Sequence, residues 1–69
     1  MVEVFKTNIT EESQAAEIIS LLSHHLPACI INFDLKDCDN ILRVKGDNFC
    51  TRQIITLLTA FGFSCNLLD

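Results

Sequence analysis

The chain has 69 residues, 49% of them hydrophobic, and nine acidic side chains against five Lys and Arg give a net charge of −4. This length predicts a single domain over residues 1–69, and the acidic balance argues against a nucleic-acid partner. No stretch approaches the roughly 18 consecutive apolar residues of a membrane helix, and no basic region precedes an apolar N-terminal run. We therefore expect a cytoplasmic protein with no membrane partner.

The N-terminal part of the chain predicts a strand followed by a helix. Residues 2–7 are rich in β-branched and aromatic side chains, with two valines on one side and Phe5 on the other, so the inward face stays open. Thr10 stands before two glutamates and predicts a helix N-cap. Apolar residues then recur at helical spacing until Pro27 ends the helix. These apolar residues are Ala15, Ile18, Ile19, Leu22 and Leu26.

The middle of the chain predicts a β-hairpin. Residues 28–36 alternate, with Ile31, Phe33 and Leu35 on a buried face and polar side chains on a wet face. Residues 37–40 are turn formers, and residues 41–45 alternate again. The two strands should therefore pair as a hairpin.

The C-terminal part repeats the helix–strand order. Residues 46–48 offer a helix cap, residues 49–61 follow helical spacing, Gly62 ends that helix and residues 63–67 read as a strand. The whole predicts an α+β, ferredoxin-like β-α-β-β-α-β sandwich. Right-handed crossovers would place both helices on one face of an antiparallel sheet of strand order 4-1-3-2.

One further pattern joins Leu26-Pro27 with residues 31–35, Leu42 with Val44, and Leu58 with Gly62-Phe63. It resembles the heavy-metal-associated (HMA) domain of small copper chaperones and metal-transporting ATPases. The run from Leu26-Pro27 through residues 31–35 is similar to the family's first helix end and second strand. Leu42 and Val44 are similar to its third strand, and Leu58 with Gly62-Phe63 to the end of its second helix. Most of these are packing positions, so the resemblance implies a fold more than an activity.

The chain departs from the family at the metal loop. HMA domains bind soft metals through a C-x-x-C pair that opens the first helix, and spacing from Ile18 places those positions at Glu11 and Gln14. Neither side chain is a thiolate, which is the ligand that Cu(I) selects. The resemblance therefore implies an HMA-like module whose metal loop is lost.

A second hypothesis uses other metal ligands. His24, His25, Cys29 and Cys50 are zinc-ligand types, and the predicted topology brings them to one end of the domain. Against this, adjacent His side chains diverge on a helix, Cys29 shares the parity of the core face, and His in a last turn suits the helix dipole. The expectation is that no metal or other cofactor is held, and the four-residue site stays an alternative.

Cys38 is the cysteine expected to be exposed, because it lies at the hairpin tip. Its acidic neighbours would oppose formation of a nucleophilic thiolate, and no His is expected nearby. The chain has no C-x-x-C pair, no Gly-rich phosphate loop and no Ser-His-Asp set. We therefore predict that the protein is not an enzyme, with a redox-responsive thiol as a minor hypothesis.

The main functional hypothesis rests on apolar side chains that are expected at the surface. Ile30 and Ile41 should point to the sheet face that the helices leave open, with Phe5 if it also faces outward, and Phe61 should lie beside Gly62. The edge strand 28–36 offers a second contact surface, which its charges would discourage. The sequence thus predicts a non-catalytic module that contacts an unidentified protein partner or forms a weak homodimer; the alternative is a metal carrier or sensor.

Overall fold

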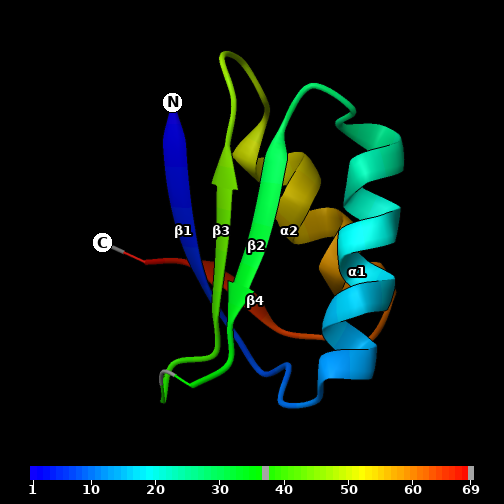
Figure 1. The fold of residues 1–69 in the computed structure, drawn as a ribbon, viewed down its shortest axis with the longest axis vertical. Coiled ribbons are helices and arrows are strands. Elements are labelled where there is room, and N and C mark those ends of the chain that lie inside the picture. Colours follow the sequence, from blue (N-terminus) through cyan, green and yellow to red (C-terminus); the bar gives the residue numbers. More distant parts are fainter. Residues whose placement is uncertain (37, 69) are drawn as a thin grey trace.

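The computed structural model describes residues 1–36 and 38–68, which form a small α+β domain with one sheet and two helices. The predicted turn at 37–40 lies partly outside the described residues, at position 37. The elements are β1 (Val2–Thr7), α1 (Glu12–His25), β2 (Ile30–Asp34), β3 (Ile41–Lys45), α2 (Thr51–Ala60) and β4 (Cys65–Leu67). Both helices lie on the same side of the strands (Figure 1).

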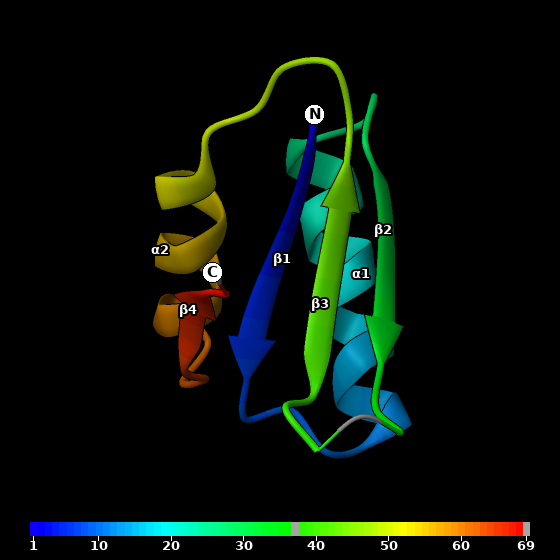
Figure 2. The same cartoon turned by 90° about the vertical axis from the view of Figure 1, so that its left-hand side faces the viewer.

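The sheet is antiparallel and has the strand order β2-β3-β1-β4, which is 4-1-3-2 when read from the β4 edge. One row of cross-strand partners joins Phe33, Leu42, Phe5 and Leu67. Cross-strand partners point to the same face of a sheet. Figure 2 looks onto the opposite face, with the helices behind it.

The core lies between the sheet and the helices. Ile31 is buried, and Phe33 and Leu35 are partly buried against the core, so the predicted inward face of this strand is confirmed. Phe5 is fully buried, so the side of the first strand that carries Phe5 is the one that faces the core. The fully buried large side chains are Phe5, Ile9, Ile18, Leu22, Leu42, Val44, Ile54 and Leu58.

The N-cap of the first helix lies one residue later than predicted. Glu11, not Thr10, is the N-cap, and its backbone N–H donates to the Gln14 side-chain oxygen at 3.4 Å. This N3-to-N-cap bond is half of a capping box. The helix ends at His25, with Leu26 as C-cap, so the predicted stop before Pro27 is confirmed.

The second helix also starts later than predicted, with Cys50 as N-cap and no cap at residues 46–48. Phe49 is only 9% exposed and belongs to the core cluster. The Phe49 ring therefore packs in the core as part of the loop, and the helix begins after it.

Gly62 ends the second helix as predicted. Its φ of +88° is in the left-handed region, its N–H donates to the Thr59 carbonyl, and the N–H of Phe63 donates to the Leu58 carbonyl, both at 3.0 Å. These two bonds define a Schellman motif, in which glycine is the favoured residue at the left-handed position. The motif turns Phe63 toward the core and leaves Phe61 54% exposed.

None of the helices in residues 1–36 and 38–68 has the length and apolar character needed to cross a membrane.

Candidate functional site

Among the described residues, Phe5, Ile30 and Ile41 do not form the apolar patch expected on the open sheet face. Phe5 is in the core, because its register partner Leu42 faces the helices, so including Phe5 in an exposed surface was wrong. Ile41 has the outward parity that was predicted but is only 4% exposed, so it is not an accessible contact residue either. Ile30 is 60% exposed, yet it lies opposite Lys45, at the other end of the strand pair from Ile41.

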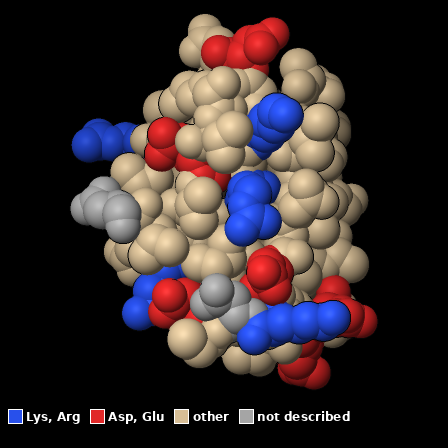
Figure 3. All heavy atoms as spheres, turned by 60° about the vertical axis from the view of Figure 1, so that its left-hand side comes forward, with Lys and Arg blue, Asp and Glu red and all other residues tan. Residues whose placement is uncertain are grey.

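Basic side chains divide the open face. Arg43 is the cross-strand partner of Asn32 on one side and Val4 on the other, and Lys45 stands between Ile30 and Val2 in the same way. In the space-filling view, blue side chains accordingly interrupt the uncharged surface (Figure 3). On the described part of the open face, charged and apolar side chains therefore lie side by side across β3 and its neighbours.

The four residues of the zinc hypothesis do not converge. His24 and His25 are both exposed, with ring centroids 5.5 Å apart and ring planes at 87°. Cys29 is half-buried and packs toward Gly46, while Cys50 is exposed at the start of α2. Across the described part of the chain, no three side chains from His, Cys, Asp and Glu come together in a possible metal site.

The cysteines differ in exposure. Cys38 is exposed as predicted, and Cys50 is exposed as well. Cys65 is 5% exposed on the inward face of β4, and burial raises the pKa of its thiol to about 11. All four cysteines are free thiols. Only Cys65 is therefore an inert core thiol by its surroundings.

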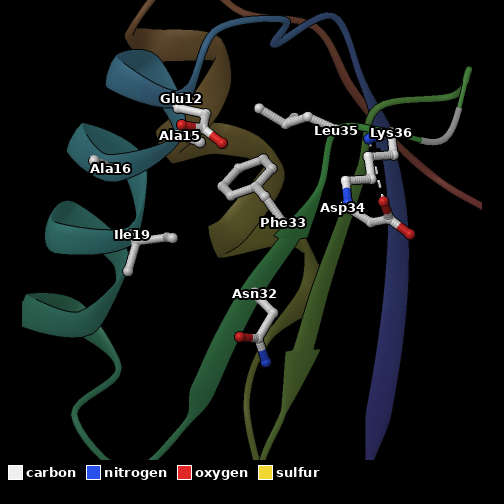
Figure 4. Close-up of a pocket in the computed structure, with 9 residues that line it drawn as sticks. All are labelled: Glu12, Ala15, Ala16, Ile19, Asn32, Phe33, Asp34, Leu35 and Lys36. Carbon is white, nitrogen blue, oxygen red and sulfur yellow. Dashed lines mark hydrogen bonds between the residues drawn. The ribbon is translucent and has the colours of Figure 1, made fainter.

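A groove of about 540 Å³ separates α1 from the segment formed by β2 and the residues just after it. Phe33 and Leu35 extend from that segment toward the helix, whose facing wall carries Ala15, Ala16 and Ile19 (Figure 4). Phe33, Leu35 and Ile19 are only partly buried against the core. The groove therefore presents apolar side-chain surface to solvent.

Charged groups gather around one end of this groove. Glu12, in the first turn of α1, lines it together with Asp34 and Lys36. The carboxylate Oδ1 of Asp34 accepts a hydrogen bond from the Lys36 backbone N–H at 3.2 Å, which closes a local turn at the end of β2. A mostly apolar hollow with a few charged groups at its rim is typical of ligand-binding sites in proteins.

The sequence did not predict this groove, because the residues that form its walls were expected to be buried in the core. Helical and strand periodicity place Ile19 and Phe33 on inward faces but do not show how completely a neighbour covers them. One sequence signal did mark this part of the chain. Residues 7–35, which contain α1 and β2, include four acidic side chains and no Lys or Arg.

Comparisons with known proteins return no match for this chain. No protein-family model matches it, and neither a curated protein nor a solved structure does.

Proposed function

We propose that this chain is a non-catalytic, HMA-like protein-interaction module of the cytoplasm, with the ferredoxin-like arrangement expected from its sequence. The groove between α1 and β2 is its contact surface. Two helices on one face of a β2-β3-β1-β4 sheet support the ferredoxin-like assignment. Four free thiols are in keeping with a reducing compartment.

The loss of the family's metal loop is supported by how its two positions are used. Gln14 accepts a hydrogen bond from the Glu11 backbone N–H, so this pair caps the helix where the family would hold a metal. Native mass spectrometry of protein purified without chelator tests this reading. The expected species is metal-free; a stoichiometric bound metal ion would favour the carrier or sensor hypothesis instead.

The observation that carries the proposal is the partly buried apolar floor of the groove, beside the edge strand β2, which within the described part of the chain pairs with β3 alone. Apolar surface left uncovered on a small domain marks a site of interaction with a protein or another ligand. The exposed side chains of Ile30, on the open sheet face, and of Phe61, after α2, lie outside this groove.

A peptide-display selection with a matched pair of variants tests the groove. Ala16→Arg places a long cation in the groove from an exposed helix position, and Thr56→Arg makes the same change at an exposed position of α2 outside it. Random peptides selected on the unmodified protein should lose binding to Ala16→Arg and keep it with Thr56→Arg. The proposal fails if no peptide is enriched, or if the enriched peptides bind both variants equally.

A further inference from the structure

We draw no further inference here: the strongest candidate, the groove between α1 and the edge strand β2, is the contact surface already proposed, and nothing in the structure shows what covers it.

Discussion

Replacing Gly46 with alanine tests a close contact that joins the start of β2 to the end of β3. A Cβ atom at Gly46 would lie 2.7 Å from Cys29 Sγ, closer than such atoms approach in proteins, and 3.5 Å from both Cys29 Cβ and Phe49 Cδ2. Overpacking of this kind costs about 1–3 kcal/mol. Only one of the three contacts is short, and its atom ends a short side chain, so we expect a loss of about 1–2 kcal/mol in unfolding free energy.

A double-mutant cycle shows whether the sulfur is the cause. Cys29→Ala removes Sγ and leaves only ordinary contacts, so the second substitution, Gly46→Ala, should then be neutral or stabilising by roughly 0.4–1 kcal/mol through the entropy of the unfolded chain. Urea unfolding monitored by circular dichroism gives the four stabilities. If Gly46→Ala costs the same with and without the Cys29 sulfur, the contact is not the reason for glycine at this position.

Substitutions at three further positions probe the fold and its pH dependence. Thr7→Val removes a buried hydroxyl that donates to the Asn40 carbonyl at 2.7 Å and accepts from the Ile9 N–H at 3.2 Å, so urea unfolding should show a loss of about 1–3 kcal/mol; a near-zero change would contradict that role. Gly62→Ala places a Cβ atom on a residue in the left-handed conformation and should lower the unfolding free energy by about 1–2 kcal/mol, with a smaller loss for Gly62→Asn. Equal stability of the unmodified protein and both variants would refute the role of Gly62 in the Schellman motif. Burial raises the pKa of Cys65 to about 11 from 9.0, so the unfolded chain loses this proton first and stability should fall between pH 9 and 11, by at most about 1.4 kcal/mol per pH unit. Below pH 9 the group contributes no pH dependence, and Cys65→Ala should remove this part of the slope; an unchanged slope would show that Cys65 is not its source.

Local patterns predicted the elements and several of their ends. Alternation in residues 28–36 placed Ile31 and Phe33 on the inward face, because strand side chains alternate whatever packs against them. Pro27 and Gly62 marked helix ends through backbone preferences that belong to the residues themselves. The helix caps were predicted less accurately. At α2, Phe49 packs in the core and the helix begins only after it.

The acidic character of residues 7–35 and the glutamate and glutamine at positions 11 and 14 are properties of the sequence alone. The exposure of individual apolar residues was decided only by tertiary structure. The sequence did not show which face of the sheet Phe5 occupies, and its pairing with the core residue Leu42 decides it. Ile41 lies on the same outward face as Ile30, but it is buried whereas Ile30 is exposed. The groove arises where α1 and the β2 edge leave Phe33 partly uncovered, because the covering of a side chain depends on distant segments that the local pattern does not contain.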